Sequence, residues 1–264
     1  MKFLFFISFL ISIPGFSQIE FIKIDTLSWS ITNLSATSFR NGDPIFNART
    51  REEWIQCLSD GIPAYCDYKN DSTIGNRFGR IYNWFAIADP RGLAPKGARI
   101  SNNRDWSDLY IFINQGVYNW QNKGLVGLRL RSVHGWRNVS PGENQYNFNI
   151  LPGGYRNENG EFVGLGNETA LWVRDTLSYG VVSKSNAMMS PFAIVNGINP
   201  DIVFTNDGKK TGCYVLLVYG LEEGLFAGMP KQNDEDFFEG QETSSGDFTR
   251  KNSKKLGVDR KDKP

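Results

Sequence analysis

The only histidine of this 264-residue chain, His134, stands in the sequence Val-His-Gly-Trp. An imidazole can act as a general base at neutral pH, but a catalytic dyad or triad also needs a serine or cysteine nucleophile beside it. The sequence contains no Gly-x-Ser-x-Gly elbow, no His-Glu-x-x-His pair and no Gly-x-x-x-x-Gly-Lys phosphate loop. We therefore set aside hydrolases of these familiar kinds and predict that His134 is structural or exposed.

The three cysteines, Cys57, Cys66 and Cys213, are the candidates for a disulfide. Cys57 and Cys66 would close a short loop, whereas a bond from Cys66 to Cys213 would join distant parts of the chain. An odd number leaves one thiol over, and the sequence alone does not choose between the pairings. No second ligand stands at the spacing of a zinc site. We expect neither a metal site nor a cofactor.

A third candidate chemistry is carbohydrate binding, which uses aromatic faces together with planar amides or carboxylates. The second half of the chain offers aromatic and polar residues for this purpose: Trp120, Trp136, Tyr155, Trp172, Asn157, Glu158 and Asn159. In the phrase LPGGYR at 151–156, Arg156 adds a planar cation that can meet a carboxylate or a sugar hydroxyl. The predicted ligand-binding set is Trp136, Tyr155, Arg156, Glu158 and Trp172. The alternative is that the tryptophans form the core and Arg156 is paired inside the domain.

The beginning of the chain predicts export. Lys2 precedes an apolar run over residues 3–13, which is followed by a Pro-Gly break and the small residue Ser17. This is the pattern of a signal peptide over residues 1–17, cleaved before Gln18. No later stretch approaches the ~18 apolar residues of a membrane helix. We expect a mature chain without a membrane span, located in the periplasm, at the outer-membrane surface or outside the cell.

The charge is almost balanced, with 29 Lys and Arg against 28 Asp and Glu. Such a chain has no overall field that would attract it to a polynucleotide, so we expect no nucleic-acid partner. The end of the chain differs in composition. Six acidic and no basic residues occupy 234–247, and 250–263 is mainly basic. With few apolar residues to bury, residues 229–264 are predicted to form a disordered charged tail.

The positions between these ends predict an α+β domain over 18–228, with its core at about 30–220. Alternating apolar residues predict strands before residue 50. A helix is predicted over 50–59, where Thr50 is a suitable N-cap and Glu53 follows three residues later, and a second over 101–113. Turn-forming residues predict a surface loop over 64–78. The stretch 79–99 joins a dense aromatic run to a connection rich in proline and glycine.

The second half predicts antiparallel strands separated by turns. The strand-like pieces are LVGLRLRS, YNFNILPGGYR, ALWVRDT, GVVS, FAIVN and GCYVLLVY. The predicted fold class is therefore α+β, with two short helices early and a loop-rich antiparallel β second half.

Several long phrases occur in an order that resembles a known family. They are GIPAYCDYKND at 61–71, FGRIYNWFAIADPRGLAPKGARI at 78–100, DW at 105–106, HGW at 134–136, NFNILPGGYRNENGEF at 147–162 and LW at 171–172. Together they resemble the Fibrobacter succinogenes major paralogous domain, a family of exported domains typical of Bacteroidota and Fibrobacteres. The resemblance covers roughly residues 30–220.

The resemblance implies a C-type-lectin-like fold, in a branch near the formylglycine-generating enzymes, and no assigned activity for most members. The chain departs from the family pattern at two places. Gly97, Ala98 and Arg99 stand where the family usually has Gly-Trp-His, and Leu217 occupies the usual place of a C-terminal cysteine. The usual disulfide to Cys66 is therefore not implied here. The calcium-binding motifs of animal C-type lectins are also absent from the sequence.

The function expected from these observations is an exported, non-enzymatic binding or interaction module of the cell envelope or extracellular space. Its partner would be a carbohydrate or another envelope protein. The alternatives are an enzyme related to the formylglycine-generating group, which would need a functional cysteine pair, and a purely structural surface scaffold.

Overall fold

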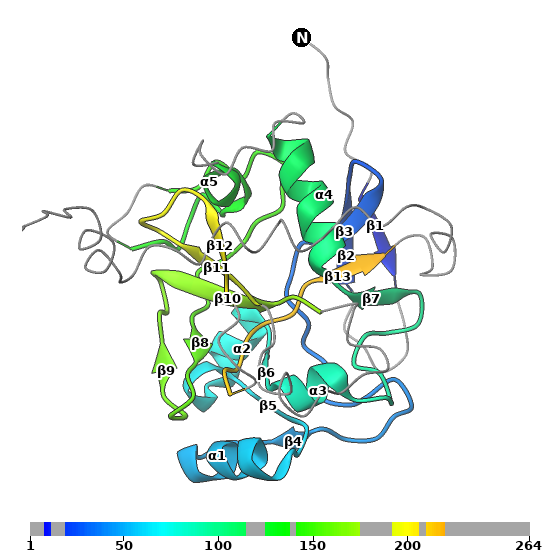
Figure 1. The fold of residues 1–264 in the computed structure, drawn as a ribbon, viewed down its shortest axis with the longest axis vertical. Helices are drawn as coiled ribbons and strands as arrows, with labels where there is room; N and C mark the ends of the chain where they lie inside the picture. The colour runs from blue at the N-terminus through cyan, green and yellow to red at the C-terminus, as the bar shows by residue number, and fades with distance from the viewer. Residues whose placement is uncertain are drawn as a thin grey trace, which may run out of the picture.

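The computed structural model describes residues 8–11, 19–114, 125–137, 141–174, 192–205 and 210–219 (Figure 1). Helices and sheets are both present, and every strand pair is antiparallel except β4 with β5. The α+β class predicted from the sequence is confirmed.

The largest sheet has five strands in the order β1-β2-β3-β13-β7. Their bounds are β1 Ser8–Ile11, β2 Ile19–Ile24, β3 Leu27–Ser30, β13 Leu217–Tyr219 and β7 Ala98–Ile100. The last strand of the described chain, β13, therefore lies between β3 near the start and β7 near the middle. The long-range register pairs Val218 with both Trp29 and Arg99.

Three smaller sheets complete the fold: β10-β11-β12, β4-β5-β6 and β8-β9. Their bounds are β4 Phe46–Asn47, β5 Ala64–Cys66, β6 Ile81–Tyr82, β8 Tyr155–Arg156, β9 Phe162–Val163, β10 Glu168–Trp172, β11 Phe192–Asn196 and β12 Ile202–Thr205. The predicted strands ALWVRDT and FAIVN correspond to β10 and β11.

The helices are α1 Arg51–Asp60, η1 Tyr68–Asn70, α2 Ser72–Phe78, α3 Trp84–Ala88, α4 Asn103–Ile113 and α5 Val126–Leu130. Both predicted helices are confirmed by their caps. Thr50 and Glu53 form a capping box at α1, and Asn102 and Asp105 form another at α4. None of the helices in the described ranges is long and apolar enough to cross a bilayer.

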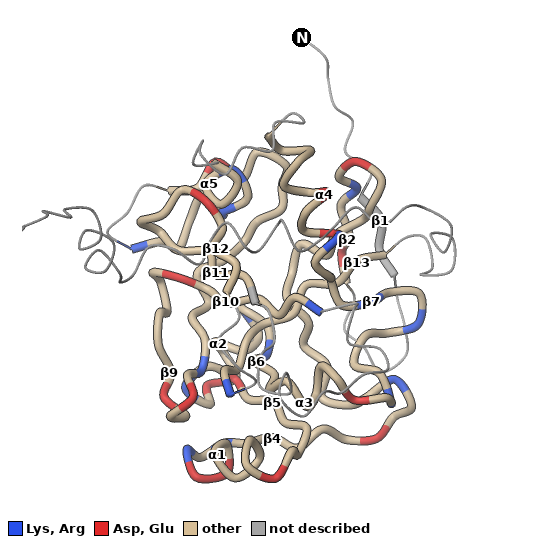
Figure 2. Tube along the Cα trace, in the orientation of Figure 1, with Lys and Arg blue, Asp and Glu red and all other residues tan. Residues whose placement is uncertain are grey.

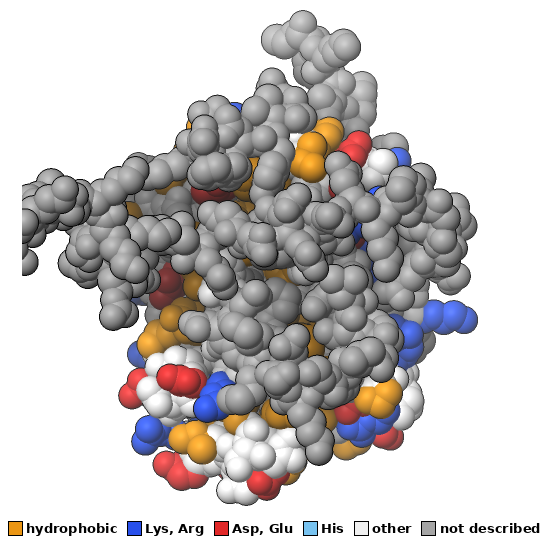
Figure 3. Space-filling model, in the orientation of Figure 1, with side chains coloured by type: hydrophobic (Ala, Val, Ile, Leu, Met, Phe, Trp, Pro, Cys, Tyr) orange, Lys and Arg blue, Asp and Glu red, His pale blue; other side chains and the backbone are white. Residues whose placement is uncertain are grey.

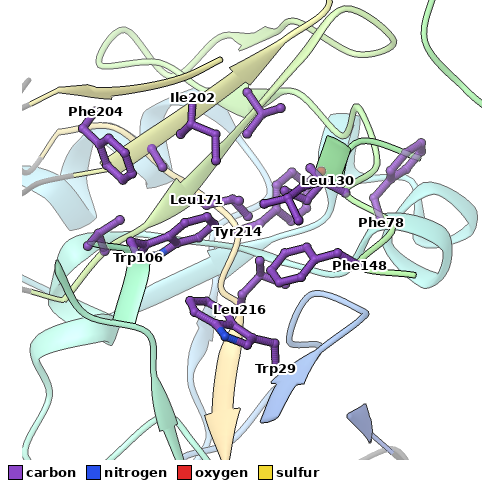
Figure 4. Packing of buried hydrophobic residues seen from close by; sticks show 14 of the residues in the cluster. Trp29, Phe78, Trp106, Leu130, Phe148, Leu171, Ile202, Phe204, Tyr214 and Leu216 are labelled. Carbon is purple, nitrogen blue, oxygen red and sulfur yellow. The ribbon is translucent and has the colours of Figure 1, made fainter. Parts of the chain in front are cut away.

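Helix α4 packs between two sheets. Trp106, on its buried face, meets Trp29 of β3 with ring centres 5.1 Å apart and Phe204 of β12 at 6.1 Å. Phe148 completes this aromatic group at 5.5 Å from Trp29 (Figure 4). Because Trp29 and Trp106 are each 1% exposed, this group anchors the main core.

A second core cluster lies on the other face of β10 and β6. Trp172 is fully buried there, and its indole Nε1 donates to the Tyr82 carbonyl oxygen at 2.8 Å. Trp84, half-buried on α3, packs on Trp172 with ring centres 5.5 Å apart. The predicted aromatic run within 79–99 thus forms β6 and α3.

Two predictions about local structure were wrong. The stretch 64–78, predicted as a surface loop, contains β5, η1 and α2. β5 is held by distant partners, β4 and β6, which local turn propensity does not reveal, and Asp71 caps α2 by accepting from the Thr73 amide. The described chain therefore has five α-helices, whereas two were predicted.

The strand-like piece LVGLRLRS is helix α5. A short apolar run does not distinguish a strand from a buried helical turn, and here Val126 and Leu130 are buried at helical spacing. In the other pieces the strands are shorter than predicted, being β8 in YNFNILPGGYR and β13 in GCYVLLVY. The predictions for GVVS, for the tail over 229–264, for Trp120 and for most of residues 1–17 lie outside the described residues.

Acidic and basic positions are interspersed along the described chain (Figure 2). The face drawn in Figure 3 shows red and blue side chains mixed around α1, without a single-sign patch among the coloured atoms.

Candidate functional site

A cavity of about 210 Å³ lies where the loop after β3, the end of α2 and the segment 148–151 meet. The last two belong to the sequence phrases that carry the family resemblance, FGR and NFNIL. Three asparagines line the cavity, Asn33, Asn76 and Asn149, and we call it the amide cavity. Segments that are far apart in the sequence therefore form one concave site.

The entrance to β6 is fixed by a contact between Asn33 and the end of α2. The Asn33 Nδ2 donates to the Phe78 carbonyl oxygen at 2.7 Å. Gly79 follows with φ of +85°, and a Cβ on it would lie only 2.7 Å from the Asn33 Cβ. Glycine is required here for both reasons, the left-handed backbone and the close approach. This contact holds one polar side of the cavity in place.

The opposite side is shaped by asparagines with positive φ. Asn144, Asn147 and Asn149 have φ of 45°, 54° and 59°, a conformation that asparagine tolerates better than most residues. The Asn149 backbone amide donates to the Asn144 Oδ1 at 2.8 Å. The turn presents the half-buried side chain of Asn149 at the cavity, and no hydrogen bond joins that side-chain amide to another described residue.

The base of the amide cavity contains an unsatisfied hydroxyl. Thr169 of β10 is fully buried, and its Oγ1 has no hydrogen-bond partner among the described residues. Thr169 and Leu171 both line the cavity, whereas Ala170 and Trp172, which alternate with them, belong to the second core cluster. A buried polar group without a partner costs about 1–3 kcal/mol, so this hydroxyl is an unfavourable feature that packing alone does not explain.

The rest of the wall is apolar. Phe78, Phe148, Leu171 and Leu216 line the cavity, and Figure 4 shows them as one group with Phe78 at its end. The described lining contains no carboxylate, and its one cation, Arg77, lies 5.0 Å from the centre of the Phe78 ring. The cavity therefore combines an apolar wall with neutral donors and acceptors, which suits an uncharged polar ligand.

Arg156, one of the predicted ligand-binding residues, is instead a structural residue. It is 1% exposed, and its guanidinium donates to the backbone oxygens of Ala48 and Thr50 at 2.8 Å and of Gly160 at 3.1 Å. The Trp54 and Phe162 rings lie 4.7 and 4.6 Å from its Cζ. The alternative stated for the sequence, an arginine paired inside the domain, is the correct one.

The other predicted residues do not meet at one surface. Trp172 is fully buried in the second cluster and is corrected from a ligand contact to a core residue. Tyr155 is half-buried beside that cluster, and Glu158 is exposed in the β8–β9 turn. Trp136 is half-buried, and its Nε1 donates to the Ser132 Oγ at 3.1 Å.

Among the predicted ligand-binding residues, Trp136 follows a residue, Gly135, that lies near a residue lining the amide cavity. A Cβ on the preceding residue, Gly135, would lie 3.7 Å from a terminal nitrogen of Arg77, which lines that cavity. His134, beside it, is exposed, and its backbone oxygen accepts from the Ser132 hydroxyl. The HGW phrase thus forms part of the surroundings of the cavity.

None of the three cysteines forms a disulfide, and all are buried free thiols. The β5–β6 register and the bridge from Tyr82 to Cys213 place Tyr65, Tyr82 and Cys213 on one face of the small sheet. Cys66, next to Tyr65, therefore faces the opposite side, and it packs in the other core cluster. Burial raises the pKa of the Cys66 thiol to about 12 and raises those of Cys57 and Cys213 as well. In the described ranges no cluster of His, Cys, Asp and Glu is arranged to hold a metal.

The sequence interpretation missed Asn33, Asn149 and Thr169. Only the run of asparagines at 144, 147 and 149 carried a signal, because asparagine favours left-handed turns. Asn33 and Thr169 lie on segments with no motif, and they reach the cavity only through long-range packing. A site of this kind is not visible as a local pattern.

A comparison of the sequence with known families gives a match. The model of the Fibrobacter succinogenes major domain matches residues 22–199, which is more than half of the chain. No curated protein and no solved structure matches the chain. The matched range contains most of the cavity lining, including Asn33, Gly79, Asn149 and Thr169. The chain belongs to the Fibrobacter succinogenes major domain family.

Proposed function

We propose that this protein is an exported, non-enzymatic binding module whose amide cavity takes a small neutral ligand with hydroxyl groups, of the carbohydrate class. The observation that carries the proposal is the buried Thr169 hydroxyl, which has no partner among the described residues and belongs to a residue that lines a cavity together with asparagines. A ligand hydroxyl would satisfy this group and would remove the cost of leaving it unpaired.

The lining supports a neutral ligand of modest size. Pockets for drug-sized ligands measure about 300–1,000 Å³, so a cavity of about 210 Å³ suits a smaller molecule, such as a terminal sugar unit. The rings of Phe78 and Phe148 would contact the apolar side of a sugar, and Asn33, Asn149 and Thr169 would serve its hydroxyls. The described lining contains no carboxylate for a cationic ligand. Its one cation for an anionic ligand is Arg77, which lies over the Phe78 ring.

A non-enzymatic role is consistent with the state of the nucleophiles. Each thiol is buried with a raised pKa, so the reactive thiolate is disfavoured. The lining of the amide cavity includes neither a cysteine nor His134. The proposal therefore assigns binding, and no reaction, to this site.

Export and the finer fold class belong to the same proposal. The sequence pattern of residues 1–17 supports a cleaved signal peptide, and the family resemblance supports a C-type-lectin-like arrangement. The structure describes Ser8–Ile11 as β1 at the edge of the main sheet, so cleavage before Gln18 would leave β2 as the edge strand. The mass of the protein recovered from the producing cell's envelope or medium tests this: an intact residue 1 would contradict cleavage.

A glycan array probed with the full chain, followed by calorimetry with the monosaccharides it selects, tests the binding proposal. Thr169→Val should weaken binding about tenfold, the equivalent of one hydrogen bond of about 1.4 kcal/mol. The control is Thr37→Val, at an exposed threonine outside the cavity lining, which should bind as the parent does. An empty array, or equal affinity of the Thr169→Val variant, would overturn the proposal.

A structural surface scaffold is the second candidate, and one observation favours it. Of the six described tryptophans, Trp29, Trp54, Trp106 and Trp172 are buried and Trp84 and Trp136 are half-buried. None of these six offers a fully exposed ring to a partner. A folded, thermally stable protein that captures no glycan in the array would select this candidate.

A further inference from the structure

A second cavity, of about 320 Å³, lies beside α3 and β7. None of its described lining residues lines the amide cavity. The described lining includes three arginines, Arg40, Arg99 and Arg174, and one acidic residue, Asp89. We call it the arginine cavity. We propose that the arginine cavity binds a small organic carboxylate whose apolar body lies against Trp84.

Arg40 is the cation best placed to capture an anion. Its Nε donates to the Ala94 carbonyl oxygen at 2.8 Å, and its backbone amide donates to the Gly92 oxygen at 2.8 Å. A Cβ on Gly92 would lie 3.4 Å from the Arg40 Cζ, so the guanidinium lies directly against the glycine. No other side-chain hydrogen bond joins Arg40 to a described residue, so its two terminal nitrogens are left without a described partner beside the cavity that Arg40 lines. A fixed guanidinium of this kind matches the two oxygens of a carboxylate.

The other charged groups of the described lining do not pair with Arg40. Asp89 is held by Arg91, with Nη2–Oδ2 at 2.8 Å and Nε–Oδ1 at 2.9 Å, and these hydrogen bonds lower its pKa. Both terminal nitrogens of Arg99 donate to the Asp105 carboxylate, and the Nη2–Oδ1 distance is 2.6 Å. Arg174 is brought beside β7 by its backbone amide, which donates to the Ser101 oxygen at 2.8 Å. Asp89 and Asp105 thus each already have an arginine, and among the described residues Arg40 has no carboxylate partner. Figure 2 shows basic positions recurring along the chain around β7.

The apolar part of the lining decides which anion fits. Trp84, Ile87 and Leu93 form a wall next to the arginines, and Trp84 is kept in place by packing on Trp172. Inorganic phosphate or sulfate would use the cations and leave this wall without a contact. A carboxylate on an aromatic or aliphatic body would use both halves, with the body on the Trp84 ring.

Titration of the full-length protein with benzoate, followed by calorimetry and tryptophan fluorescence, tests the proposal. Benzamide is the matched neutral probe, and inorganic phosphate is the matched anion without an apolar body. Benzoate should bind at least tenfold more tightly than either. If benzamide bound as tightly as benzoate, the cavity would not select an anion. If phosphate bound as tightly as benzoate, the assignment to an organic carboxylate would be wrong.

Variants locate the site. Arg40→Gln should weaken benzoate binding at least tenfold, and Arg40→Lys, which keeps the charge but loses the planar fork, should weaken it less. Lys96→Gln is the control, because Lys96 is an exposed cation in the turn before β7 and does not line the cavity. Arg40 is also exposed, so circular dichroism should show an unchanged fold. Parent-like affinity in a folded Arg40→Gln protein would overturn the proposal.

The carboxylate has two candidate sources, a free molecule or the acidic segment 234–247 of the chain itself. A full-length variant that neutralises all six acidic residues of the segment separates them: Asp234→Asn, Glu235→Gln, Asp236→Asn, Glu239→Gln, Glu242→Gln and Asp247→Asn. Tighter benzoate binding by this variant would identify the chain's own carboxylates as competing occupants of the site. Unchanged binding would assign the site to a free carboxylate.

Discussion

Arg156 donates from its Nη1 to the backbone oxygen of Ala48 at 2.8 Å, although 108 residues separate them. A second terminal nitrogen reaches the Thr50 oxygen, at the N-cap of α1. One buried cation therefore attaches the first helix to the β8–β9 hairpin.

Replacing Arg156 should destabilise the protein strongly. Arg156→Gln removes the cation from three backbone oxygens and from the ring of Trp54, and it should lower the free energy of unfolding by about 3 kcal/mol. Urea denaturation measures this change. Glu158→Ala, an exposed change two residues away, should stay within about 0.5 kcal/mol of the parent. A similar small effect for Arg156→Gln would contradict the structural role.

Gly79→Ala should lower the free energy of unfolding by more than the strain of a positive φ alone would. Its Cβ would lie 2.7 Å from the Asn33 Cβ in addition to the positive φ, so we expect a loss of about 2–4 kcal/mol. Gly42→Ala is the matched control, because Gly42 has φ of +93° but nothing within 4 Å of the added Cβ. It should lose only about 1 kcal/mol. Equal melting temperatures for the two variants would show that the Asn33 contact is not tight.

The three thiols should be inert in the folded protein. At pH 8 a disulfide-exchange reagent should react with none of Cys57, Cys66 and Cys213 in buffer, and with all three in urea, because the native thiols are buried and protonated. Reductant should leave the melting temperature unchanged. A rapidly reacting native thiol, or a reductant-sensitive melting temperature, would show that the cysteines are exposed or paired.

Stability should decline in alkaline solution. The Cys66 pKa rises from an ordinary value of 9.0 to about 12 in the folded state, so the folded chain keeps its proton where the unfolded chain has lost it. The contribution is fully present below pH 9 and is lost as the pH rises through about 12. Urea denaturation between pH 8 and pH 11 should show this fall, and Cys66→Ala should make it shallower. A slope unchanged by that substitution would exclude Cys66 as its cause.

Thr169→Val should stabilise the unliganded protein by up to about 1 kcal/mol. The substitution keeps the shape and removes a buried hydroxyl that has no partner among the described residues. Thermal unfolding without ligand measures the change. A loss of more than about 1 kcal/mol would mean that the hydroxyl has a partner in the native protein, and would weaken its assignment to a ligand.

Local sequence patterns were sufficient to predict the helices and strands whose caps or bounding turns are visible in the sequence itself. Thr50 with Glu53 marked the start of α1, and short apolar pieces bounded by turn residues marked β10 and β11. Patterns failed where a distant partner decides the structure: β5 exists because β4 and β6 flank it, and α5 because Gly127 packs against the backbone of Asp201. Arg156 was recognised as a residue with chemistry, but its burial depends on Ala48 and Thr50, far away in the sequence. The amide cavity was invisible for the same reason.

The central position of β13 has a consequence for the time course of folding. β13 joins β3 to β7, so the main sheet is complete only when residues 217–219 are available. Contacts that close so long a loop form slowly, because the chain entropy is lost before the contacts are gained. A nascent chain that has exposed only its first two hundred residues has no strand to place between β3 and β7. The main sheet of such a chain therefore stays incomplete until residues 217–219 have been made.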